Sequence, residues 1–324
     1  MPESHARGPF PAAAGVRIGR TELPGSVRSG IEGPLGSRVM TAASQPSGFP
    51  PGTALRLQLG DGRRAFVKAV GREPNPQSPA LRREEARMLA QSPRTAPVPG
   101  LLGVHDDGDW AALVLEDVEG RHPELAWQIG ELPRITAALE ELQAQLTPCP
   151  LADLPADLPT VEERHQEVFN GWRRLLQEPL PGLDPWALRH LGPLAQMESQ
   201  WPEASSGDTL LHSELRTDHL LFSPSGSVLF LDWPGACRGA DWFDPLVMGP
   251  SVTMQGGPDP EWLVRHQAGA QQADPQGITT VVLARAGYFA HRSLLPAPPG
   301  LPTLRPFQAA QGRVAIQWAA VRTG

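Results

Sequence analysis

The segment LLHSELRTDHLLF, residues 210–222, is the most informative part of the sequence, and VLFLDW follows it at residues 228–233. Two short apolar segments enclose a polar loop, and a turn at residues 223–226 leads into a third apolar segment that ends in an acid, Asp232. This pattern predicts short strands on both sides of a loop, and a further buried strand after the turn. An acid at the end of that strand, facing a polar loop, has the chemistry of a metal ligand.

Lys68 is the only lysine among 28 basic residues of the chain. A general depletion of lysine would also leave one by chance, so the surrounding sequence decides its meaning. Residues 53–59 and 64–70 alternate in polarity around Gly60-Asp61-Gly62, which predicts a β-hairpin. By the period of two, Lys68 shares a strand face with apolar neighbours, where an ammonium group needs an anionic partner.

Glu85 is the predicted partner of Lys68. Ser78-Pro79 is typical of a helix start, and the helix is expected to run to about Gln91. Its apolar stripe consists of Leu81, Met88 and Leu89. At 100° per residue Glu85 falls in the middle of that stripe. A buried carboxylate and a buried ammonium are each costly alone, so an ion pair between them explains both.

Two further segments are candidates for contact with a ligand. QPSGFPPG, residues 45–52, precedes the hairpin and offers Gly48 and Gly52, although a Pro/Gly turn without a ligand explains it equally well. Residues 113–120 run from an apolar strand into the polar connection Glu116-Asp117-Val118-Glu119-Gly120. We place the boundary between two lobes there, with residues 1–30 as a flexible tail, 31–118 as one lobe and 119–324 as the other.

The C-terminal lobe is predicted to be mostly helical. Apolar residues recur at helical spacing and Pro-rich stretches separate the segments. The expected helices cover residues 132–146, 160–177, 184–200, 259–273, 276–294 and 304–322. The fold class is therefore α+β, with a small antiparallel sheet followed by a larger helical part.

Composition excludes several classes of protein. With 40% hydrophobic and 19% charged residues, the 324-residue chain is too apolar to be disordered. No apolar run reaches the roughly 20 residues of a membrane span, and no secretory signal is evident, which predicts a cytoplasmic protein. Cys149 and Cys237 are isolated, so neither a disulfide framework nor a cysteine metal site is expected.

The formal charge of −7 argues against nucleic acid as a partner and favours, weakly, a cationic small molecule. The sequence does not indicate an oligomeric state.

Taken together, residues 33–255 resemble the aminoglycoside phosphotransferase family, which has a protein-kinase-like fold. Members of that family resemble the patterns His-Gly-Asp-x-x-x-x-Asn and Ile-Asp-Trp, preceded by a Glu-Asp-hydrophobic-x-Gly connection between the lobes. The matching pieces, in chain order, are Phe66-Val67-Lys68, Glu85, Leu115-Glu116-Asp117-Val118-Glu119-Gly120, His212-Ser213-Glu214, Leu231-Asp232-Trp233 and Trp242-Phe243-Asp244.

The resemblance implies an ATP- and Mg²⁺-dependent enzyme that transfers the γ-phosphoryl group to a hydroxyl of an aminoglycoside or another hydroxylated metabolite. Lys68 would then contact the α- and β-phosphates, and Glu85 would orient Lys68. Asp232 and His219 would bind Mg²⁺, and Glu214 would accept the proton of the hydroxyl.

The same resemblance implies the nucleotide contacts. The loop with Gly48 and Gly52 would cover the phosphates, and Glu116, Asp117 and Val118 would contact the adenine.

This chain departs from the family's pattern at the two most chemical positions. Glu214 replaces the catalytic aspartate, and its extra methylene moves the carboxylate by roughly 1 Å, a misplacement that can cost about a hundredfold in rate. His219 replaces the metal-binding asparagine, although Mg²⁺ prefers oxygen donors. Asp218, next to His219, is a candidate substitute ligand.

Three interpretations therefore stay open. The first is an active kinase that acts on a small molecule. The second is a pseudokinase that binds a nucleotide or another ligand without transfer. The third is a zinc hydrolase that uses His212, Glu214, His219 and Asp232. His212 is more simply explained as a structural residue of the loop, and Asp241 and Asp244 as anchors that hold the loop by hydrogen bonds.

Overall fold

The structure is a computed structural model. It describes residues 11, 13, 17–45, 48–49, 51–93, 95–128, 130–150 and 158–324. Most of residues 1–16, and residues 46, 47 and 50 of the predicted loop before the hairpin, lie outside the described part.

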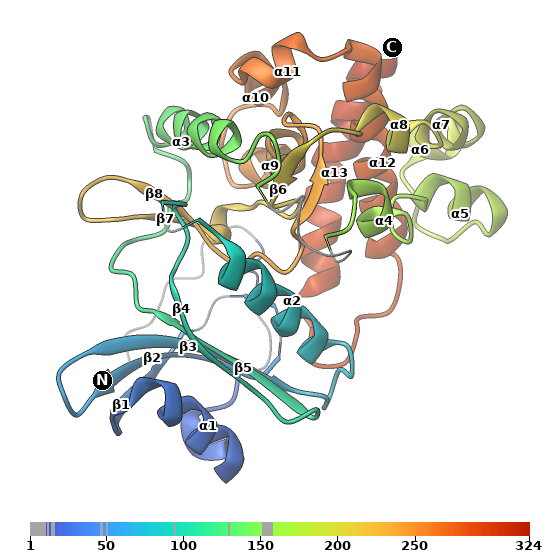
Figure 1. The fold of residues 1–324 in the computed structure, drawn as a ribbon. Coiled ribbons are helices and arrows are strands. Elements are labelled where there is room, and N and C mark those ends of the chain that lie inside the picture. The colour runs from blue at the N-terminus through green and yellow to red at the C-terminus, as the bar shows by residue number, and fades with distance from the viewer. Residues whose placement is uncertain are drawn as a thin grey trace.

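A five-stranded antiparallel sheet forms the N-terminal part of the molecule (Figure 1). Its order is β1-β2-β3-β5-β4, and its strands are Val39–Ser44 (β1), Thr53–Leu59 (β2), Arg64–Gly71 (β3), Leu101–Asp106 (β4) and Trp110–Glu116 (β5). The predicted β2–β3 hairpin is confirmed, and Gly62 adopts a positive φ of 88° in its turn. The polar turn places Lys68 opposite Ala54 on one side and Leu113 on the other.

Helix α1, Gly25–Leu35, covers one face of the sheet and buries Val27, Ile31 and Leu35 against it. These residues follow helical spacing within a segment rich in Gly, Ser and Pro, a composition that hid the helix from the sequence prediction. The expected flexible tail over residues 1–30 is thus wrong for residues 17–30, which include η1, Arg20–Glu22, and the start of α1.

Helix α2, Ser78–Gln91, lies on the other face of the sheet, between the sheet and the helical part (Figure 1). Its bounds match the prediction. The predicted stripe was partly wrong, because Leu81 is 37% exposed whereas Glu85 is only 1% exposed. The buried face instead runs from Arg82 through Glu85 to Met88 and Leu89.

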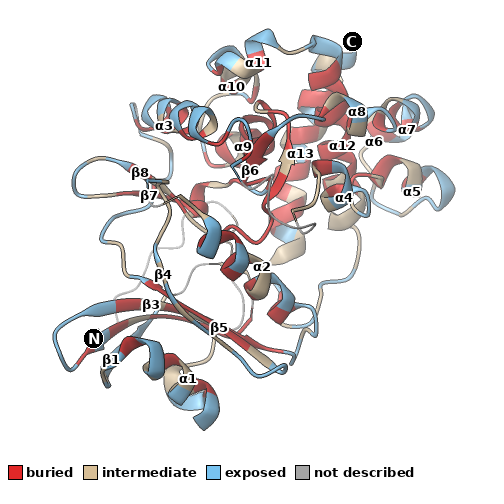
Figure 2. Ribbon diagram, in the orientation of Figure 1, coloured by how far each residue is buried: buried red, intermediate tan, exposed pale blue. Residues whose placement is uncertain are grey.

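The C-terminal part is built around two long helices, α12 (Pro275–Ser293) and α13 (Leu304–Thr323), which are buried along much of their length (Figure 2). Around them lie α3 (Glu131–Gln145), α4 (Val161–His165), α5 (Gly171–Gln177), α6 (Pro185–Arg189), α7 (Leu191–Glu198), α8 (Trp201–Ala204), α9 (Phe243–Met254), α10 (Glu261–Arg265) and α11 (Ala268–Gln272). Trp172, Trp201, Phe169 and Phe243 fill the core between them.

Three of the six predicted helices are single helices, and the other three are interrupted. The interruptions fall at Asn170, His190 and Gln267, where the backbone leaves the helical conformation. At Gln267 the reason is visible, because its buried side chain donates a hydrogen bond to the carbonyl of Thr136 at 3.0 Å. Within the described ranges, none of the helices combines the length and the apolarity that crossing a bilayer requires.

Two small two-stranded sheets hold the loop that the sequence analysis identified. β6 (Thr209–Leu211) pairs with β9 (Cys237–Gly239), and β7 (Leu220–Phe222) pairs with β8 (Val228–Phe230). The 3-10 turn η2, Thr217–His219, ends the loop just before β7. The predicted strands are confirmed. The pairing of β7 with β8 places His219, just before β7, beside the end of β8.

Gly52 shows where backbone packing requires glycine. Its φ is 106°, and a Cβ there would lie against the carbonyl oxygen of Ala69, whereas Gly62 has a positive φ but open space around it. We expect Gly62→Ala to lower the free energy of unfolding by roughly 1–2 kcal/mol, and Gly52→Ala by roughly 1–3 kcal/mol more, because only the second adds a steric clash. Urea denaturation of both variants measures the difference; equal losses would contradict it.

Candidate functional site

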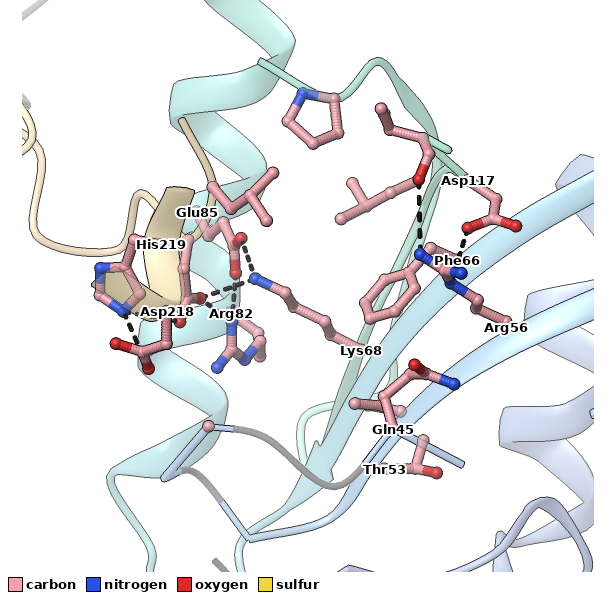
Figure 3. Close-up of a pocket in the computed structure, with 18 of the residues that line it drawn as sticks. Gln45, Thr53, Arg56, Phe66, Lys68, Arg82, Glu85, Asp117, Asp218 and His219 are labelled. Carbon is pink, nitrogen blue, oxygen red and sulfur yellow. Dashed lines mark hydrogen bonds and ion pairs between the residues drawn. The ribbon is translucent and has the colours of Figure 1, made fainter. Parts of the chain in front are cut away.

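Lys68 lies at the centre of the charged site between the sheet and the helical part (Figure 3). Its Nζ donates hydrogen bonds to Glu85 Oε1 at 2.6 Å and to Asp232 Oδ1 at 2.7 Å. The Lys68 side chain is 16% exposed and that of Glu85 only 1%. The ion pair predicted from the sequence is present, and it includes the acid at the end of β8.

Arg82 is a member of this site that the sequence interpretation missed. It precedes Glu85 by three residues in α2, its Nη1 bonds to Glu85 Oε2, and the same nitrogen lies 3.0 Å from Asp232 Oδ1. Spacings of three residues bring side chains together on one helix face, so the signal was present in the sequence. We call Lys68, Arg82, Glu85 and Asp232 the charged cluster; it balances two cations against two anions.

Asp232 is held in the charged form. Burial by itself raises the pKa of this carboxyl, but the nearby Lys68 and Arg82 outweigh burial and hold the pKa well below its usual range. Its φ of 67° is unusual for a residue with a side chain. Asp232 therefore stays negatively charged between Lys68 and Arg82.

His219 faces the second oxygen of Asp232, with Nε2 at 3.6 Å from Oδ2. Burial, and then the neighbouring Arg216, lower the pKa of His219 to about 3, so its ring is neutral at pH 7. Arg216 binds Asp218 through two nitrogens, at 2.9 and 3.0 Å. Asp218 thus pairs with Arg216, and it also lines the cleft.

These residues do not fit Mg²⁺. Asp232 Oδ1 already accepts hydrogen bonds from two cations, and its other neighbour is an imidazole where Mg²⁺ requires oxygen. No group of three His, Cys, Asp or Glu side chains placed to hold a metal occurs in the described ranges. The predicted metal ligands Asp232 and His219 are brought together, but as parts of an ion-pair network.

The zinc interpretation is contradicted by the same geometry. His212 uses both ring nitrogens in the loop: Nε2 donates to the carbonyl of Leu231 at 2.8 Å, and Nδ1 accepts from the backbone N–H of Glu214 at 3.3 Å. Asp244 accepts the backbone N–H groups of His212 and Ser213 at 2.8 and 2.7 Å. The predicted structural roles of His212 and Asp244 are confirmed.

Glu214 is exposed and lies outside the cleft that contains the charged cluster. Its negative charge raises the pKa of two arginines, Arg216 and Arg285 of α12. For Arg216 the larger effects are burial, which lowers the pKa, and Asp218, which raises it. Neither Lys68 nor Asp232 is hydrogen-bonded to Glu214, so its role as proton acceptor stays a prediction.

The far end of the cleft contains the predicted adenine contacts. Glu116, Asp117 and Val118 all line the cleft. The Asp117 carboxylate is turned to the strands, where it binds Arg56 Nε at 3.2 Å and Arg64 Nη2 at 2.6 Å (Figure 3). This leaves the backbone of the connection, together with Leu115, to face a ligand.

Gln45, Gly48 and Pro51, between β1 and β2, line the cleft. Gly48 lines it with a φ of 94°, and its carbonyl accepts a hydrogen bond from Arg17 Nη2 at 3.0 Å. Arg17, which lies in the predicted tail, is therefore also a lining residue. Gly52 does not line the cleft; its role is the close approach to Ala69.

Phe49 of the same segment reaches the helical part. Its ring packs edge-on against Phe307 of α13, with centroids 5.1 Å apart. The Arg216 guanidinium lies over both rings, 5.5 Å from Phe49 and 5.8 Å from Phe307. We call these three residues the aromatic bridge; it connects the two parts of the molecule beside the charged cluster.

Comparison with solved structures identifies the fold. The aminoglycoside phosphotransferase APH(4)-Ia, in a ternary complex with AMP-PNP and hygromycin B, matches with a TM-score of 0.64 at 12% identity, over 91% of this chain and 99% of that one. Choline kinase LicA from Streptococcus pneumoniae matches with a TM-score of 0.62 at 12% identity, over 91% and 98%. An aminoglycoside phosphotransferase from Alicyclobacillus acidocaldarius matches at 0.55 and 14%, over 88% and 92%.

The chain therefore has the bilobal, kinase-like fold of these phosphotransferases, as the sequence resemblance predicted. Comparisons with protein-family models and with curated protein sequences find no match. At these identities the likeness establishes the fold, and the chemistry depends on the side chains.

The buried position of Glu85 predicts a large loss of stability on its removal. Glu85→Gln leaves Lys68 and Arg82 to share one carboxylate, and we expect the free energy of unfolding to fall by roughly 3 kcal/mol. Glu84→Gln is the matched control on the same helix, because Glu84 is partly exposed and pairs with Arg164 at 2.9 Å, a contact worth at most about 1 kcal/mol. Urea denaturation compares the two; similar losses would argue against a buried cluster.

The neutral imidazole of His219 predicts a pH effect on stability. The pKa of His219 is about 3 in the folded protein and near 6.5 in the unfolded chain, so between these values only the unfolded chain takes up the proton. As the pH falls from 6.5 to 3, the wild type should lose up to roughly 4 kcal/mol relative to His219→Asn. Denaturation across this range measures it, with exposed His190→Asn expected to parallel the wild type; a wild-type curve parallel to His219→Asn would contradict it.

Proposed function

We propose that the protein binds a nucleoside triphosphate in the cleft between its two lobes, with residues 31–118 as the nucleotide-binding lobe. The charged cluster carries this proposal. Lys68 and Arg82 are two cations of the cleft that can bind phosphate oxygens. A ligand anion would compete with Asp232 for both. Solved structures of the same fold include complexes with AMP-PNP and with ADP.

The base would lie at the other end of the cleft. Leu115, Leu221 and Leu231 supply apolar surface there, and the backbone of residues 116–118 supplies hydrogen-bonding groups. An apolar pocket with a few placed polar groups is typical of a site for a flat heterocycle.

We propose further that this binding does not depend on Mg²⁺. The cation that balances the phosphates is Arg82, whose Nη1 lies 3.0 Å from Asp232 Oδ1. A guanidinium binds phosphate oxygens through several directed hydrogen bonds and keeps its charge at all physiological pH values. Arg17, which lines the same cleft, adds a third positive charge.

Transfer of phosphate to a hydroxylated small molecule, including an aminoglycoside, is a second candidate function. The observation that favours it is the intact framework of the loop, in which His212 and Asp244 hold the backbone on both sides of Ser213. Glu214 projects from that framework as an exposed carboxylate able to accept a proton. Substrate-stimulated release of ADP across a panel of hydroxylated metabolites tests it, and Glu214→Gln should abolish any release that is found.

Nucleotide binding is tested by thermal denaturation with ATP. We expect ATP to raise the melting temperature of the wild type equally with Mg²⁺ and with EDTA, because Lys68, Arg82 and Arg17 supply the cations that contact the phosphates. Arg82→Met should weaken ATP binding by roughly tenfold or more, the effect of losing a charge-assisted hydrogen bond.

Arg83→Met is the matched control, since Arg83 is the next residue of α2 but pairs with Asp106 on the surface at 2.7 Å. It should bind ATP like the wild type. Stabilisation by ATP only in the presence of Mg²⁺ would overturn metal independence, and no stabilisation in either condition would overturn nucleotide binding.

A further inference from the structure

Arg285, in the middle of α12, is a buried cation without an anionic partner. Its residue is only 9% exposed, and it forms no hydrogen bond or ion pair with any residue that the structure describes. Its Nε is fully buried and unpaired. The guanidinium lies over the rings of Tyr288 and Phe289, with distances to the centroids of 5.3 and 4.6 Å.

The neighbouring arginines differ from Arg285 in this respect. Arg216 binds Asp218 at 2.9 Å, and Arg164 binds Glu84 at 2.9 Å. The field around them is positive: burial and then the charges of Arg285 and Arg164 lower the pKa of His165 to about 3. His165 is therefore a neutral ring that adds no further positive charge, and it stacks on Phe169.

Glu214 is the carboxylate that attracts Arg285, but the two do not form an ion pair. Glu214 is exposed in the loop after β6, whereas Arg285 is buried in helix α12. A buried unpaired guanidinium is expensive, and proteins normally pair such a group or replace it with an apolar side chain. Rings on one side stabilise a cation only modestly.

We propose that Arg285 binds the anionic group, a carboxylate or a phosphate, of a small molecule that lies beside Glu214. The planar guanidinium matches the two oxygens of either group. The inference does not depend on nucleotide binding. If the second candidate function holds, this molecule is the acceptor, and its anion places a hydroxyl near Glu214. The local charge therefore favours an anionic ligand, in contrast to the cationic one that the net charge suggested.

Arg285→Met tests the proposal, because methionine keeps the length and apolar stem but removes the charge. Without ligand, we expect Arg285→Met to leave the melting temperature unchanged or to raise it by a few degrees, since an unpaired buried charge is removed. Arg292→Met, about two turns further along the same helix and partly exposed, is the matched control. It should behave as the wild type throughout.

The probes are glycolate and L-serine for carboxylates, and glycerol 3-phosphate and inorganic phosphate for phosphates. Calorimetric titration should show saturable binding of at least one probe to the wild type, and Arg285→Met should weaken it by at least roughly tenfold. Phosphate probes are titrated with ATP present, so that the charged cluster is occupied. If ATP does not bind at all, the carboxylate probes still report on Arg285, which separates this proposal from the proposed function.

Three results would overturn the proposal. One is that no probe binds the wild type. Another is that a probe binds wild type and Arg285→Met equally, which would place it elsewhere. The third is that Arg285→Met and Glu214→Gln each lower the melting temperature by the same amount while the double variant loses no more, because the two side chains would then be partners of each other.

Discussion

The contact of Lys68 with both Glu85 and Asp232 is the interaction on which the rest of the structure depends. It joins three elements that are distant in sequence: strand β3, helix α2 and the end of β8. Because the four charges of the cluster are balanced, they can be held in a largely buried place, and removal of any one leaves the remaining charges unbalanced. The position of α2 between the sheet and the helical part follows from this requirement as much as from Met88 and Leu89.

The same cluster explains why the site differs from a metal-dependent one. Oδ1 of Asp232 already accepts from an ammonium and a guanidinium, and the imidazole of His219, which lies beside Oδ2, offers no oxygen to a dication. Asp244 and His212 nevertheless hold the backbone around the neighbouring loop by hydrogen bonds. The scaffold and its charges thus support binding more directly than transfer.

The sequence predicted the features that follow from strand and helix periodicity, but not those that depend on contacts between segments distant in the chain. The β2–β3 hairpin, the buried position of Glu85 and its ion pair with Lys68 follow from strand and helix periodicity. Arg82 was missed, although the helical period places it beside Glu85, because a polar residue was not expected to be buried there. Helix α1 was missed because its Gly- and Pro-rich composition outweighs three apolar residues. The isolation of Arg285 and the exposure of Glu214 depend on how α4, α12 and the loop pack together, which no local pattern contains.

The aromatic bridge connects a residue of the segment between β1 and β2 to the C-terminal helix α13. Phe49 belongs to a segment that covers the cleft, and its contact with Phe307 and Arg216 attaches that segment to α13. The lobes cannot swing apart without separating these rings and exposing Phe307, which is 3% exposed. Phe307 and Arg216 therefore hold Phe49 against the helical part although neither of them lines the cleft.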